Sequence, residues 1–115
     1  MSVGRRAVLP AGVRRHVRAM VKGLVEEFQP ERIVLIGSYA RGEATRDSDV
    51  DLVVVMRANG SKREQQLRMR VALRDVHVPK DILVVTAREW HVQRNIPGTI
   101  VWPARREGVV LYEKA

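Results

Sequence analysis

The chain has 115 residues and no cysteine, and its 21 lysines and arginines outnumber its 13 acidic residues, giving a formal charge of +8. This length suits one domain with a single core, so we expect one domain over residues 1–115 with a flexible start at about 1–9. The lack of cysteine excludes disulfides and thiolate metal sites. No apolar run approaches the roughly 20 residues of a membrane-spanning helix, and we expect a cytoplasmic protein.

The predicted elements alternate between helices and strands. Apolar side chains recur at helical spacing over residues 11–28, and Pro30 ends this helix. A β-branched apolar run predicts a strand over residues 32–36, which a glycine-serine bend and a short helical turn over 39–41 follow. We then expect a strand at 50–56, a turn at 58–61, a helix at 62–76, a strand at 81–85, a short helix ending at 91, a helix at about 99–106 and a strand at 108–112. Ser61 and Thr86 are placed to cap the helices that follow them, and the helix at 62–76 has Leu67, Val71, Leu73 and Val76 available for burial.

This alternation predicts an α/β or α+β fold, in which helices flank a small mixed β-sheet. The strands are apolar at nearly every position, so the centre of the sheet should be buried on both faces. The positive charge is spread along the chain rather than gathered in one run. It fits a polyanionic partner such as a nucleoside triphosphate, RNA or an acidic protein, and nucleic acid is not the favoured primary partner.

Two aspartates open the second predicted strand. Asp49 and Asp51 are two residues apart, and side chains at that spacing lie on the same face of a strand. Two neighbouring carboxylates repel each other unless a cation binds between them. Mg²⁺ is the natural candidate because it prefers oxygen ligands and leaves room for substrate phosphates. Asp47, which continues the same spacing, reads mainly as a loop residue.

A second candidate feature lies where the first strand ends. Gly37 and Ser38 come directly after the apolar run and before the short helical turn. Backbone N–H groups and a small hydroxyl at such a bend can hold phosphate oxygens, and glycine lets the backbone approach a ligand closely. Taken alone, this dipeptide is also typical of an ordinary strand-to-helix turn.

Together the two features resemble the signature of the polymerase β-like nucleotidyltransferases. The stretches Gly-Ser-Tyr-Ala-Arg-Gly and Ser-Asp-Val-Asp-Leu-Val-Val-Val are similar to those of its minimal nucleotidyltransferase branch. The resemblance implies the polymerase β-like fold and a third metal-binding carboxylate on a later strand, which Asp81 matches. It also implies catalysis by two Mg²⁺ ions at Asp49, Asp51 and Asp81, with ATP as the nucleotide substrate.

The resemblance also suggests roles for neighbouring residues. Gly37 and Ser38 would hold a phosphate of the nucleotide, and Asp81 would be a candidate general base. Arg41 and Arg46 lie close enough in the sequence to assist with phosphate charge.

Small members of this branch resemble antitoxins that adenylylate a HEPN-domain toxin. The resemblance therefore implies transfer of AMP to a protein hydroxyl, foremost a tyrosine of a HEPN partner. Transfer to RNA or to a small molecule is an alternative, as is an antitoxin that neutralises its partner by contact without catalysis.

Overall fold

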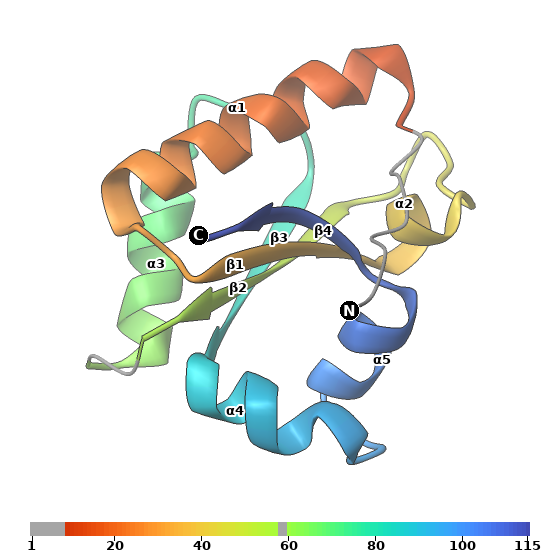
Figure 1. The fold of residues 1–115 in the computed structure, drawn as a ribbon. Helices are drawn as coiled ribbons and strands as arrows, with labels where there is room; N and C mark the ends of the chain where they lie inside the picture. Colours follow the sequence, from red (N-terminus) through yellow and green to blue (C-terminus); the bar gives the residue numbers. More distant parts are fainter. Residues whose placement is uncertain (1–8, 58–59) are drawn as a thin grey trace.

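The computed structural model describes residues 9–57 and 60–115, which fold into one four-stranded mixed sheet flanked by helices (Figure 1). The elements are α1 (Ala11–Phe28), β1 (Arg32–Ile36), α2 (Gly37–Arg41), β2 (Val50–Met56), α3 (Lys62–Ala72), β3 (Lys80–Thr86), α4 (Ala87–Val92), η1 (Gln93–Asn95), α5 (Val101–Glu107) and β4 (Val109–Glu113). The predicted fold class is confirmed, and the predicted first helix and first two strands match α1, β1 and β2. The ends of α5 and β4 differ from the prediction by one or two residues, as helix and strand ends often do.

The strands lie in the order β3-β2-β1-β4. Strand β1 pairs antiparallel with both β2 and β4, whereas β2 and β3 pair in parallel. Helix α3 lies between β2 and β3 in the sequence and makes the crossover that a parallel pair requires. The parallel register places Asp51 opposite Asp81, and the antiparallel register places Ile36 opposite Asp51.

Both faces of the sheet are covered, as the apolar strands predicted. Alternate residues of β1 divide between two clusters: Ile33 and Leu35 join one, and Val34 joins the other. Helices α1 and α3 contribute to the first cluster, and α4 and α5 contribute to the second (Figure 1). Each fully buried Val, Leu, Ile or Met side chain contributes about 1.5–3 kcal/mol of transfer free energy. The sheet is therefore a rigid base for side chains at its ends.

Helix α3 differs from its prediction in length and in the face that it buries. It ends at Ala72 rather than near residue 76, because the chain turns through residues 73–79 to enter β3. Met69 and Leu73 face the core, whereas Leu67 is 63% exposed and Val71 is 49% exposed. The prediction that Leu67 and Val71 are buried is wrong, because they lie four residues apart on another face of the helix.

Two helix starts have the caps that the sequence predicted. The Ser61 side chain accepts a hydrogen bond from the N–H of Glu64 and caps α3. Thr86 and Glu89 form a capping box at α4, in which each side chain accepts from the backbone N–H of the other.

Some predictions fall on parts of the chain outside the described residues. Residues 58–59 of the expected turn and residues 1–8 of the expected flexible start lie there. Leu9, the last residue of that start, is described and is buried in the core. Within the described part of the chain, none of the helices combines the length and apolar character of a membrane span.

Candidate active site

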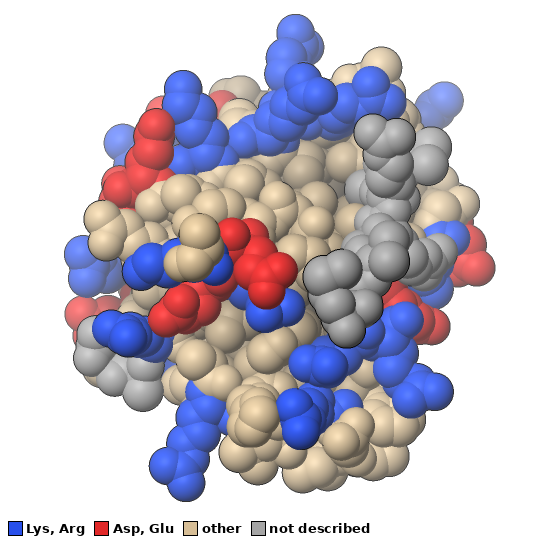
Figure 2. All heavy atoms as spheres, in the orientation of Figure 1, with Lys and Arg blue, Asp and Glu red and all other residues tan. Residues whose placement is uncertain are grey.

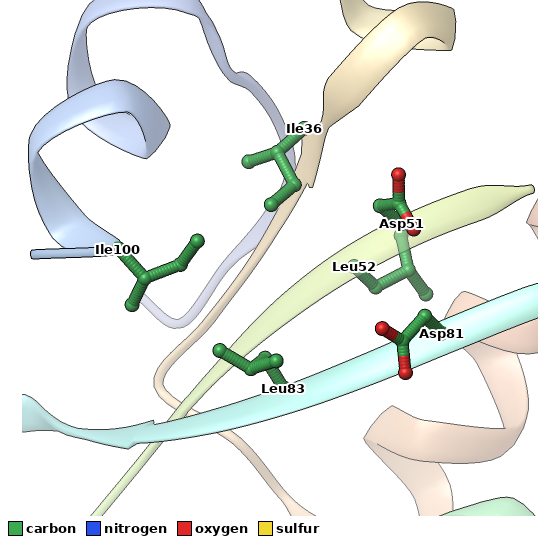
Figure 3. A pocket seen from close by; sticks show the side chains of 6 residues that line it. All are labelled: Ile36, Asp51, Leu52, Asp81, Leu83 and Ile100. Atoms are coloured by element: carbon green, nitrogen blue, oxygen red, sulfur yellow. The ribbon is translucent and has the colours of Figure 1, made fainter.

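A pocket of about 250 Å³ opens at the end of the sheet where β2 and β3 begin. Its acidic lining comes from Asp51 of β2 and Asp81 of β3, which lie side by side in Figure 3. Ile36 from β1, Leu83 from β3 and Ile100 before α5 form its apolar side. The pocket therefore places two carboxylates against an apolar wall.

The structure brings together two of the three predicted carboxylates. Asp51 and Asp81 are opposite each other in the register of the parallel pair, and both line the pocket. Asp51 is half-buried, whereas Asp81 and Asp49 are exposed. Asp49 lies just before β2 and does not line the pocket, although its charge acts on Asp51.

Burial raises the pKa of Asp51 above its usual value, and repulsion from Asp81 and Asp49 raises the pKa further. The positive charge of Arg41 acts in the opposite direction. These surroundings destabilise the ionised form of Asp51, and a bound cation would offset that free-energy cost. A perturbed carboxylate in a pocket is also a mark of a functional site.

Gly37 fits closely against the Asp51 carboxylate. Its φ angle is +77°, in a region that L-residues with side chains rarely adopt. A Cβ atom placed on Gly37 would lie 2.5 Å from Oδ2 of Asp51. Gly37, which belongs to the predicted glycine-serine bend, therefore allows the backbone to lie close to the carboxylate of Asp51, another predicted site residue.

The remaining predicted site residues are Ser38, Arg41 and Arg46. Ser38 follows Gly37 in α2, and its carbonyl oxygen accepts a hydrogen bond from the Glu43 N–H at 2.9 Å. Arg41 ends α2 and forms an ion pair with Glu43 at 2.9 Å, and this hydrogen bond raises the pKa of Arg41. Arg46 is exposed in the turn before β2, and no contact found in residues 9–57 and 60–115 joins it to the three carboxylates.

The chemistry of the donors fits a hard divalent cation. Carboxylate oxygens are the ligands that Mg²⁺ prefers, and Asp51 and Asp81 both line one pocket. In the part of the chain that the structure describes, no three acidic, histidine or cysteine side chains are already gathered as a ligand set. Asp51 and Asp81 thus line one pocket, whereas Asp49 does not.

Sequence reasoning did not find Arg70, which contacts the third carboxylate. Its Nη2 atom donates to Oδ1 of Asp81 at 2.8 Å. The contact joins two residues 11 positions apart, across the turn between α3 and β3, so no local spacing indicates it. The apolar wall of the pocket was also missed, because Ile36, Leu83 and Ile100 come from three separate segments.

The architecture is that of a solved nucleotidyltransferase-like fold. The chain superimposes on the crystal structure of a "putative nucleotidyltransferase" from Sulfolobus solfataricus with a TM-score of 0.64. The match covers 99% of this chain and 93% of the other, at 18% sequence identity. At that identity the likeness defines the class of fold.

The sequence then identifies the family. The sequence model of the nucleotidyltransferase domain matches residues 17–108, and the chain belongs to this family of enzymes. The span includes Gly37, Ser38 and all three predicted aspartates.

Two relatives come from Methanocaldococcus jannaschii. "Putative protein adenylyltransferase MJ0141" is 35% identical over 54 residues, which are 47% of this chain and 54% of the relative. "Putative protein adenylyltransferase MJ1379" is 40% identical over 42 residues, which are 36% of this chain and 42% of the relative. The chain thus spans about half the length of the curated relatives it matches.

Proposed function

We propose that this protein transfers AMP from ATP to an acceptor hydroxyl, with divalent cations held by Asp49, Asp51 and Asp81. The observation that carries the proposal is that Asp51 and Asp81 are register partners on adjacent strands and line one pocket, with Gly37 packed against Asp51. Membership of the nucleotidyltransferase family supports the reaction class.

The proposed reaction forms a bond between the acceptor hydroxyl and AMP and releases pyrophosphate. Mg²⁺, when bound, would neutralise triphosphate charge and lower the pKa of the attacking hydroxyl. The acceptor oxygen forms a bond to the α-phosphorus, the bond from that phosphorus to the bridging oxygen breaks, and pyrophosphate leaves. Asp81 is exposed on the pocket and takes the hydroxyl proton as general base.

The bend after β1 supplies the phosphate contacts in this proposal. Gly37 lies against the Asp51 carboxylate, and the Gly37 backbone and the Ser38 hydroxyl would hold a phosphate of the nucleotide beside it. Arg41 contributes positive charge to the same region, since its charge partly offsets the rise in the pKa of Asp51. Arg46 would need a movement of its turn to reach a phosphate.

We infer that the acceptor is a protein hydroxyl, foremost a tyrosine of a HEPN-domain toxin, which would make the chain an antitoxin. The names of the two archaeal relatives support a protein acceptor. Figure 2 shows lysines and arginines scattered over one face with acidic side chains among them, rather than one continuous basic groove. On this face the charge pattern does not single out RNA, because nucleic acid binding relies on concentrated positive charge.

A transfer assay with a matched pair of variants tests the proposal. Asp49→Asn removes a proposed metal ligand, whereas Asp47→Asn makes the same change two residues earlier in the exposed turn. We expect Asp49→Asn to lower AMP transfer from labelled ATP in Mg²⁺ to a HEPN-domain protein by at least 100-fold, because a direct ligand is lost. Asp47→Asn should keep activity within about twofold of the wild type, since exposed substitutions away from a site have small effects.

The same assay separates the alternatives. Label appearing on RNA or on a small molecule, with none on protein, would replace the proposed acceptor. Neutralisation of the partner that persists in an Asp49→Asn, Asp51→Asn double variant would instead indicate inhibition by contact.

A further inference from the structure

Asp81 is held by an arginine that reaches it from the other side of the sheet. Alternation along β2 and β3 places Asp51 and Asp81 on the face covered by α4 and α5. Arg70 belongs to α3, whose Met69 and Leu73 pack on the opposite face. Because β3 is at the edge of the sheet, Arg70 can pass around that edge and pair with Asp81 at 2.8 Å.

A second side chain of α3 fixes the helix to the same edge. Gln66 lies one turn before Arg70, on the same side of the helix. Its Oε1 atom accepts a hydrogen bond from the backbone N–H of Val84 at 2.7 Å, on the strand that carries Asp81. Gln66 therefore anchors α3 to β3, and Arg70 extends from this anchored helix to the carboxylate.

We propose that Arg70 is a positioning residue for metal binding, which holds one oxygen of Asp81 so that the other is presented to a divalent cation beside Asp51. The inference rests on the proposed function. Both side chains of the pair are about half exposed, at 53% for Arg70 and 51% for Asp81, so packing restrains the Asp81 rotamer only in part. The hydrogen bond from Arg70 supplies that restraint, as partners of metal-binding carboxylates commonly do.

The arginine has two opposing effects on a cation. Its positive charge repels the cation, so removing the charge alone would tighten binding. Its hydrogen bond orients the ligand, so removing the bond would weaken binding. The pair is exposed to solvent, which screens the repulsion, and we expect the orienting effect to dominate. The sign of the change in metal affinity therefore tests the role of Arg70.

The test is the affinity of the protein for Mn²⁺ alone, measured from the electron paramagnetic resonance signal of free Mn²⁺. Arg70→Ala should weaken Mn²⁺ binding by about tenfold, within the range for partners of metal ligands. Arg70→Lys should recover part of that loss, because lysine keeps one donor but not the planar fork of arginine. Asp81→Asn should weaken binding at least as much as Arg70→Ala.

Two control variants separate positioning from charge and from structure. Arg68→Ala removes the same charge from an exposed position on α3 and should leave Mn²⁺ affinity unchanged. Gln66→Ala removes the anchor to Val84 and should lower the melting temperature, with a smaller loss of Mn²⁺ affinity than Arg70→Ala causes. Arg70→Ala should show the reverse pattern, with a small change in melting temperature and a large change in affinity.

Two results would overturn the inference, and they have different meanings. If Arg70→Ala binds Mn²⁺ as tightly as the wild type or more tightly while Asp81→Asn binds weakly, Arg70 has no positioning role and the proposed function stands. If Asp81→Asn also leaves Mn²⁺ affinity unchanged, the metal site itself is wrong and both proposals fail.

Discussion

Gly37 lies close against the Asp51 carboxylate in the candidate site. Gly37 has a φ angle of +77°, and an added Cβ would lie 2.5 Å from the Asp51 carboxylate. Either the backbone or the carboxylate would have to move to admit a side chain. Gly37 therefore links the proposed phosphate contacts at the bend to the proposed metal ligand Asp51.

Gly37→Ala should cost stability and activity together. The positive φ alone costs about 1–2 kcal/mol for a residue with a side chain. The displaced Asp51 carboxylate should in addition lower AMP transfer by at least tenfold. Chemical denaturation and the transfer assay measure the two effects, and Gly42→Ala is a useful control. Gly42 also has a positive φ, of 75°, but its Cβ would meet nothing within 4 Å. Equal activities of the two variants would contradict the role given to the contact.

The raised pKa of Asp51 gives a prediction about pH. The folded state holds the proton more tightly than the unfolded state, so ionising Asp51 destabilises the metal-free protein as pH rises through the raised pKa. Asp51→Asn should therefore melt at a higher temperature than the wild type at pH 7 without metal. The difference should shrink as pH falls, because the wild-type carboxyl becomes protonated. A higher melting temperature for the wild type at pH 7 in the presence of a chelator would contradict this account.

At the scale of elements, the sequence predicted the strands well because their apolar, β-branched runs are long and bounded by turns. It also predicted the caps Ser61 and Thr86, because each hydroxyl residue lies directly before its helix in the sequence. It failed for the face of α3, where Leu67 and Val71 were expected inside and are exposed. The orientation of α3 depends on its contacts with β3 and α1, which local periodicity does not contain.

The site was predictable to the extent that its residues lie close together in the sequence. Gly37, Asp49 and Asp51 could be selected from their spacing and chemistry. Asp81 could be selected only through the family resemblance, since nothing local distinguishes it from a solvated acid. The parallel pairing of β2 with β3, which sets Asp81 opposite Asp51, is a long-range contact. Arg70 depends on that pairing and on the position of α3, so sequence reasoning could not reach it.

At the scale of the whole molecule, the sheet places Asp51 of β2 and Asp81 of β3 beside one pocket. The chain's membership of the nucleotidyltransferase family and its match to a solved fold agree with this arrangement. Asp49 remains outside the pocket in the described geometry. For Asp49 to act as the proposed metal ligand, its side chain must turn inward when a cation and the nucleotide bind.

Crystals grown with Mn²⁺ and a non-hydrolysable ATP analogue test this requirement most directly, because anomalous scattering locates the ion independently of the protein density. We expect an anomalous peak between Asp51 and Asp81, with Asp49 turned toward it and the triphosphate lying along Gly37 and Ser38. Nucleotide bound elsewhere, or carboxylates that point apart with no peak between them, would contradict it.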